Sequence, residues 1–115
     1  MIERTMLEEM FENMRTKSKW NVDGELLWGY FFTDKSRKKL HRAAEALEKM
    51  GYETVGVFQD ESKTFYWLHV ERVEKHDVNS LEKRNAELEK FAAEAGLESY
   101  DGMDACEVPQ DVEDA

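Results

Sequence analysis

One segment of the sequence, residues 25–33, limits the possible folds more than any other. It reads ELLWGYFFT, is dense in aromatic side chains and is bounded by residues that favour turns. Aromatic side chains fit best on a pleated, partly buried surface, so this segment is predicted to be a buried β-strand. A buried strand needs partner strands beside it and a layer of other elements to cover it, and the rest of the chain must supply both.

Three further segments are predicted to be strands, at residues 52–59, 64–73 and 100–108. The first two are separated only by the polar run DESK, which favours a hairpin. Before residue 52, and again before residue 100, the sequence has apolar residues at helical spacing followed by a glycine, Gly51 or Gly96, that suits the end of a helix. We expect Thr33 or Asp34 to cap the first helix and Asp77 or Asn79 to begin the second.

The predicted domain organisation has three parts. Residues 1–20 form an amphipathic N-terminal helix, because Ile2, Met6, Met10 and Met14 recur at helical spacing. Residues 21–109 form an α+β domain, and residues 110–115 form a mobile acidic tail. The interpretation of the methionine stripe is packing rather than a binding site.

The order of elements in the α+β domain is β-α-β-β-α-β. A four-stranded antiparallel sheet with two helices on one face buries both helical stripes, which is the ferredoxin-like arrangement. The predicted strand order is 4-1-3-2, with the first and third strands at the centre of the sheet.

Two helices leave one face of this sheet open. If Trp28 points toward the helices, the alternation of side chains along a strand turns Phe31 outward. The same alternation turns Phe65 and Trp67 outward on the third predicted strand. Three alternatives follow for these rings: the N-terminal helix covers them, they bind a protein, or they stack RNA bases as in RRM domains.

The charge of the chain bears on the choice among these alternatives. The net charge of the 115 residues is −10, and residues 98–115 contain seven acids and no base. Phosphate backbones require clustered lysine and arginine, so direct binding of nucleic acid is not expected, whereas a basic protein is a suitable partner. Asp101, Asp104 and Glu107 are the acids that we assign to such a contact, together with the three outward rings.

The sequence contains no recognisable catalytic, cofactor or metal site. His41, His69 and His76 lack metal-ligand spacing, and Cys106 is the only cysteine. No Walker loop or GxGxxG motif is present. We therefore predict a protein that is not an enzyme and that needs no cofactor. Without a membrane-spanning stretch or a signal-peptide pattern, the expected location is the cytoplasm.

The segment ESYDGMD, residues 98–104, resembles the Y-D-G-W segment of the RraB family of ribonuclease E inhibitors. The resemblance extends to an acid-rich N-terminal helix, a strand leading into a capped helix, and a helix that ends in Gly-Tyr-Glu, here residues 51–53. It covers about residues 2–113. Met103 departs from the pattern, since the family usually has Trp there.

The resemblance implies a cytoplasmic protein that binds ribonuclease E and lowers its activity by contact, without catalysis, and it implies the same ferredoxin-like fold. The alternative is a ferredoxin-like module that binds RNA or a different protein. The motif Tyr100-Asp101-Gly102 also has a structural interpretation from its residues alone. Asp101-Gly102 is a turn or bulge signal, and Tyr100 would anchor it against the core.

Overall fold

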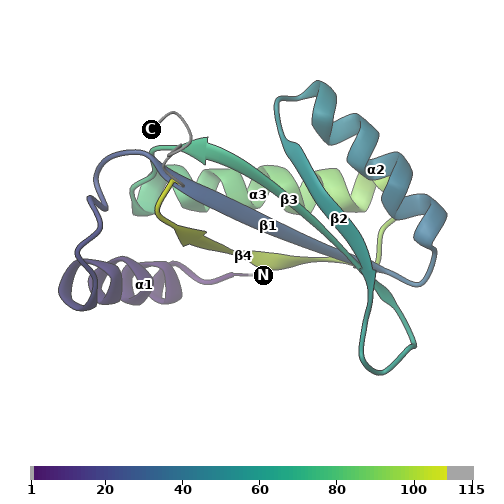
Figure 1. The fold of residues 1–115 in the computed structure, drawn as a ribbon, viewed down its shortest axis with the longest axis horizontal. Helices are drawn as coiled ribbons and strands as arrows, with labels where there is room; N and C mark the ends of the chain where they lie inside the picture. The colour runs from purple at the N-terminus through teal and green to yellow at the C-terminus, as the bar shows by residue number, and fades with distance from the viewer. Residues whose placement is uncertain (1, 109–115) are drawn as a thin grey trace, which may run out of the picture.

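The predicted buried strand is β1, Leu26–Asp34, and it lies inside a four-stranded antiparallel sheet (Figure 1). The computed structural model describes residues 2–108. The strand order is β2-β3-β1-β4, so β1 is hydrogen-bonded along both edges. The predicted α+β class with four antiparallel strands is confirmed. The other elements are α1 (Arg4–Lys17), α2 (Arg37–Lys49), β2 (Glu53–Gln59), β3 (Tyr66–Glu74), α3 (Val78–Ala95) and β4 (Ser99–Cys106).

The ends of the helices follow from local hydrogen bonds. Helix α3 is capped at its start by Asp77, whose carboxylate accepts the Ser80 backbone N–H in a capping box, and at its end by Gly96, which has φ of 74°. Both predictions for α3 are confirmed. The predicted cap of α2 is wrong, because Ser36 occupies that position and accepts the Lys39 N–H. Asp34 instead accepts the backbone N–H groups of Ser36 and Glu98, which joins the end of β1 to α2 and β4.

The inward side chains of the two central strands form the floor of the core. Trp28, Tyr30 and Phe32 on β1 are fully buried, which confirms the predicted alternation. Leu68 and Val70 on β3 are buried beside them. The helices contribute the facing layer of this same core: Leu40, Ala43, Ala44 and Leu47 from α2, and Leu81, Leu88 and Ala92 from α3.

Helix α1 packs against α3 and extends the core past the end of the sheet (Figure 1). Its buried residues are Leu7 and Phe11, and the Phe11 ring lies 5.9 Å from the ring of Trp28, an inward residue. Arg4 donates hydrogen bonds to Glu82 and Asn79 on α3. The alternative in which the N-terminal helix covers the outward rings of the sheet is therefore wrong.

The Tyr100-Asp101-Gly102 motif forms a β-bulge. Along β1, Phe31 pairs with Gly102 and Phe32 pairs with Tyr100, so Asp101 is the extra residue. Gly102 has φ of 131°, a backbone conformation that favours glycine. Tyr100 is buried and donates a hydrogen bond of 2.5 Å to Asn85 on α3. The predicted bulge and the predicted anchor are both confirmed.

A buried polar cluster fixes the end of β3 to the start of α3. The Glu74 carboxylate accepts hydrogen bonds from the Tyr30 hydroxyl at 2.6 Å and from Arg84 at 2.5 Å, and His76 lies 3.1 Å from it. Burial by itself raises the pKa of Glu74, but the hydrogen bonds from His76 and Tyr30 and the charge of Arg84 outweigh it and lower the pKa to about 2. His76 is thereby explained as a structural residue.

This cluster makes stability depend on pH. Glu74 has a folded-state pKa below its ordinary value of 4.5, so its contribution is complete above pH 4.5 and is lost as the pH falls toward 2. Glu74→Gln should lower the free energy of unfolding at pH 7 by about 3 kcal/mol, measured by urea denaturation. The difference between variant and wild type should shrink steadily between pH 4.5 and pH 2.

The matched control is Glu45→Gln on the exposed side of α2, which should change stability by less than about 0.5 kcal/mol at either pH. If the loss of unfolding free energy in Glu74→Gln is the same at pH 7 and pH 3, the charge of Glu74 does not stabilise the fold as described.

Candidate protein-binding face

The outward side of the sheet has a row of residues that face solvent. Directly paired residues of antiparallel strands share a face, and the register places Gly102, Phe31, His69 and Gly56 in one row across all four strands. The Phe31 and His69 rings stack with centroids 4.4 Å apart. In the next row, Trp67 pairs with Phe58 on β2. Together Phe31, Phe58, Trp67 and His69 line a shallow hollow with almost entirely apolar walls, here called the aromatic groove.

Hydrogen bonding and ring contacts hold the wall of the groove in place. The Trp67 indole N–H donates to the Asp60 carboxylate at 2.8 Å, and this bond is the main reason that the pKa of Asp60 is lowered. The Trp67 ring meets Phe31 edge-on at 6.4 Å and Phe65 at 5.6 Å. The rings of Phe31 and Trp67, which are already held in place, lose little conformational entropy when a ligand binds.

Two glycines leave room for the side chains that form this surface. A Cβ at Gly56 would lie 2.8 Å from the Phe58 ring, and one at Gly29 would lie 2.7 Å from both Asp104 Oδ1 and His69 Nε2. The His69 ring and the Asp104 carboxylate thus both fold over Gly29. The groove and the neighbouring acidic residues are parts of one continuous surface.

The row next to the groove is acidic. The register aligns Glu53, Glu71, Gly29 and Asp104 across the four strands, and the three carboxylates are here called the acidic row. Burial, then the negative charges of Asp104 and Glu71, raise the pKa of Cys106. A raised pKa keeps the thiol protonated and makes it a poor nucleophile. The acidic row therefore acts electrostatically on its surroundings.

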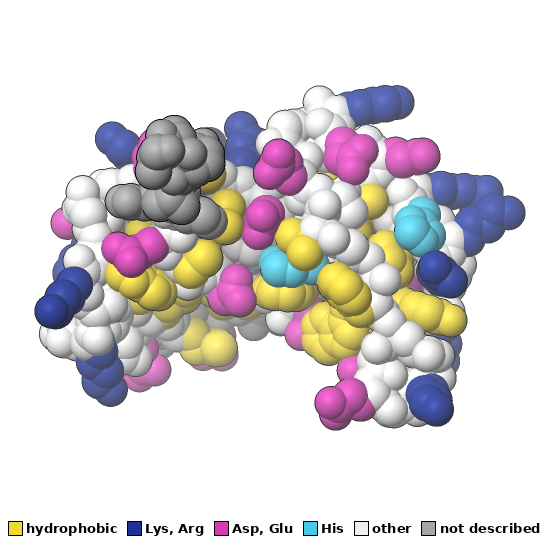
Figure 2. All heavy atoms as spheres, viewed as in Figure 1, with side chains coloured by type: hydrophobic (Ala, Val, Ile, Leu, Met, Phe, Trp, Pro, Cys, Tyr) yellow, Lys and Arg dark blue, Asp and Glu magenta, His cyan; other side chains and the backbone are white. Residues whose placement is uncertain are grey.

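No basic side chain of the four strands balances these acids on the outward face. The strands contain one lysine or arginine, Arg72, and its guanidinium lies over the buried Tyr52 ring, 5.3 Å from its centroid. Figure 2 views the side of the sheet opposite α3, as Figure 1 does, and shows hydrophobic and acidic side chains around one histidine, with basic side chains at the margins. An apolar surface that carries negative charge attracts cationic groups and repels phosphate. It therefore suits a basic protein better than a nucleic acid.

The structure brings together only some of the residues predicted from the sequence. Phe31 and Trp67 line the groove, and Asp104 is in the acidic row. Phe65 lies just before β3 rather than on it, which corrects the predicted strand boundary, but its ring still contacts Trp67. The exposed Asp101 is the extra residue of the bulge, and the exposed Glu107 follows the end of β4.

Sequence reasoning missed the contribution of β2 to this face. Phe58 is 50 % exposed and lines the groove, and Glu53 begins the acidic row. The glycine inside the predicted strand, Gly56, was the available signal, because an isolated glycine in a strand often marks a bulge. A register shift between Thr54 and Gly56 confirms that a bulge is present.

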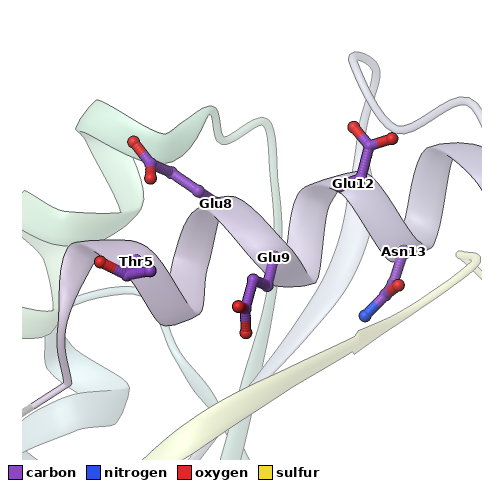
Figure 3. A pocket seen from close by; sticks show the side chains of 5 residues that line it. All are labelled: Thr5, Glu8, Glu9, Glu12 and Asn13. Atoms are coloured by element: carbon purple, nitrogen blue, oxygen red, sulfur yellow. The ribbon is translucent and has the colours of Figure 1, made fainter.

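A second acidic surface lies on α1, where Thr5, Glu8, Glu9, Glu12 and Asn13 are exposed (Figure 3). All five belong to a single helix, and their side chains point in different directions from it. This surface gathers no side chains from another element around a common point. Within residues 2–108, no group of three or more His, Cys, Asp or Glu is arranged to hold a metal ion, and no helix is long and apolar enough to cross a membrane.

Comparison with known proteins identifies a family that the chain matches. Residues 4–105 match the model of a protein family described as Regulator of ribonuclease activity B, or RraB. The matched region begins at the start of α1 and ends one residue before the end of β4, so it contains the groove and the acidic row. No curated protein sequence matches the chain significantly.

The geometry around Gly29 gives a test of this surface. Gly29→Ala would place a methyl group against the ends of the Asp104 and His69 side chains, and both ends are free to rotate away. We expect a loss of stability below about 1 kcal/mol, together with loss of the His69–Phe31 stacking. Urea denaturation and the NMR shifts of the His69 ring protons measure the two effects. A loss above about 2 kcal/mol would mean that the backbone, rather than the surface, requires glycine.

Proposed function

The chain belongs to the RraB family of regulators of ribonuclease activity, and from this premise we propose that it binds ribonuclease E and inhibits it by protein contact. In this proposal the protein is not an enzyme and acts in the cytoplasm without a cofactor. We interpret its scaffold as the ferredoxin-like arrangement, with the outward face of the sheet as the contact surface.

The observation that carries the proposal is the joined aromatic groove and acidic row. Interface centres are enriched in aromatic side chains, and Phe58 and Trp67 provide rings that are accessible to a partner. Glu71 and Asp104 form no salt bridge among the residues that the structure describes, so their charges are available to a partner. Such a surface suits a basic segment of a protein.

Inhibition would follow from occupation of a basic segment that otherwise binds RNA or another component of the degradation machinery. Opposite charges steer the encounter and raise the association rate, and this effect weakens as salt screens the charges. The apolar groove contributes binding that depends less on salt. The proposed contact residues are Phe31, Phe65, Trp67, Asp101, Asp104 and Glu107, and we add Phe58, His69 and Glu71 because they lie on the same face.

One observation favours the alternative of RNA binding. Phe31 and Trp67 lie on the two central strands, as base-stacking rings do in RRM domains. Two observations weigh against it. The acidic row lies directly beside the rings, and the only arginine of the strands points inward. Phosphates of a bound RNA would meet negative charge, so we favour a protein partner.

Phe58→Ala tests the groove with little risk to the fold, because half of this side chain is already exposed. If the groove is the contact, the inhibition constant against ribonuclease E should rise about tenfold, the effect of losing a central aromatic contact. Ribonuclease assays with a fluorescent RNA substrate measure it, and circular dichroism checks the fold.

Met50→Ala is the matched control, since Met50 is 52 % exposed but lies at the end of α2, away from the groove. Equal inhibition by wild type, Phe58→Ala and Met50→Ala would exclude the groove. Micromolar binding of single-stranded RNA that is lost in Phe58→Ala would favour the RNA alternative instead.

The acidic C-terminal residues need a separate test, because residues 110–115 lie outside the described part of the chain. Deleting them removes Asp111, Glu113 and Asp114. We expect weaker inhibition at low salt, by less than Phe58→Ala causes, and almost none of this loss at high salt. Inhibition assays at two salt concentrations measure the effect. A truncation more damaging than Phe58→Ala would move the main contact from the sheet to the tail.

A further inference from the structure

The aromatic groove and the acidic row together have the chemistry of a site for a guanidinium group. We infer that the groove binds an arginine side chain of the partner and distinguishes it from lysine. This inference rests on the proposed function, because it assumes that the face binds a basic protein, and it adds the side chain that is recognised.

The first reason is the kind of ring surface available. The rings of Phe31, Phe58 and Trp67 come from three adjacent strands, and His69 lies between them. A guanidinium is planar, delocalised and weakly hydrated, so it stacks on aromatic faces more favourably than an ammonium group does. The hydrogen bond from the Trp67 indole N–H to the Asp60 carboxylate fixes the orientation of the indole.

The second reason is the position of the carboxylates. Asp104 Oδ1 and His69 Nε2 are both 2.7 Å from the same point above Gly29, so the carboxylate lies at the border of the groove. Glu71 follows His69 by two residues on β3 and faces the same side, roughly 7 Å away along the strand. A cation stacked on the rings is therefore within reach of two carboxylates that have no partner among the described residues.

Two other occupants fit less well. A second copy of this chain, packed face to face through a two-fold axis, would bring one acidic row toward another. A nucleic acid would bring phosphates to the same carboxylates. Only a cationic side chain has both an apolar surface for the rings and a charge for the acids, and charge complementarity thus selects the occupant.

The test uses the full-length protein and three synthetic twelve-residue Gly/Ser peptides that each contain four arginines, four lysines or four citrullines. Citrulline keeps the shape of arginine and removes its charge. Binding is followed by NMR through the Trp67 indole N–H signal at constant salt. The arginine peptide should bind about five- to tenfold more tightly than the lysine peptide, and the citrulline peptide should hardly bind.

Two variants test the contribution of the rings and the contribution of the negative charge separately. Phe58→Leu keeps an apolar side chain but removes a ring, and it should abolish most of the preference for arginine. Asp104→Asn should weaken binding of the arginine and lysine peptides to a similar degree, by about threefold. The control Glu45→Gln removes the same charge from α2 and should leave both affinities unchanged.

Equal affinity for the arginine and lysine peptides would overturn the inference, as would equal effects of Asp104→Asn and Glu45→Gln. Dimers that dissociate in Phe58→Leu, seen by sedimentation, would overturn it in favour of a second copy. Inhibition of ribonuclease E is measured separately. Inhibition without arginine preference refutes this inference alone, whereas arginine preference without inhibition refutes the proposed function and leaves the arginine site intact.

Discussion

The structure depends on the double pairing of β1. This strand is hydrogen-bonded to β3 on one edge and to β4 on the other, so its backbone cannot shift without breaking both ladders. A slip of one residue would turn Trp28, Tyr30 and Phe32 out of the core and Phe31 into it. The large free energy of burying three aromatic side chains therefore also fixes the composition of the outward face. The groove is positioned by the core beneath it.

Much of this arrangement could be predicted from the sequence, because successive side chains of a strand point to opposite faces of the sheet. The charged Glu71 indicates which residues of β3 face outward, and the outward positions of Trp67 and, on the paired strand, Phe31 follow. The bulge at Asp101 was also predictable, since Asp-Gly is a strong local signal. The sequence of each central strand therefore predicts which of its side chains face solvent.

The contribution of β2 could not be predicted in the same way. Counting alternately from the buried Tyr52 would place Phe58 on the inward face. The bulge between Thr54 and Gly56 adds one residue, which reverses the alternation and turns Phe58 outward beside Trp67. A bulge depends on pairing with the neighbouring strand, which periodicity in one segment does not contain. The prediction of the α2 cap was wrong for a related reason. The Asp34 carboxylate accepts backbone N–H groups from Ser36 and from Glu98, and the second of these contacts depends on the tertiary fold.

Two glutamates of β3 have opposite surroundings on the two faces of the sheet. Glu74 points inward, where Tyr30, His76 and Arg84 surround its charge, and this paired charge stabilises the fold. Glu71, three residues earlier, lies on the outward face next to Asp104 with only Gly29 between them. Two like charges on a shared surface repel each other in the free protein, and a cation placed between them removes that repulsion. Carboxylates thus stabilise the fold on one face of the sheet, and on the other they give the surface the negative charge on which the proposed binding of a basic partner depends.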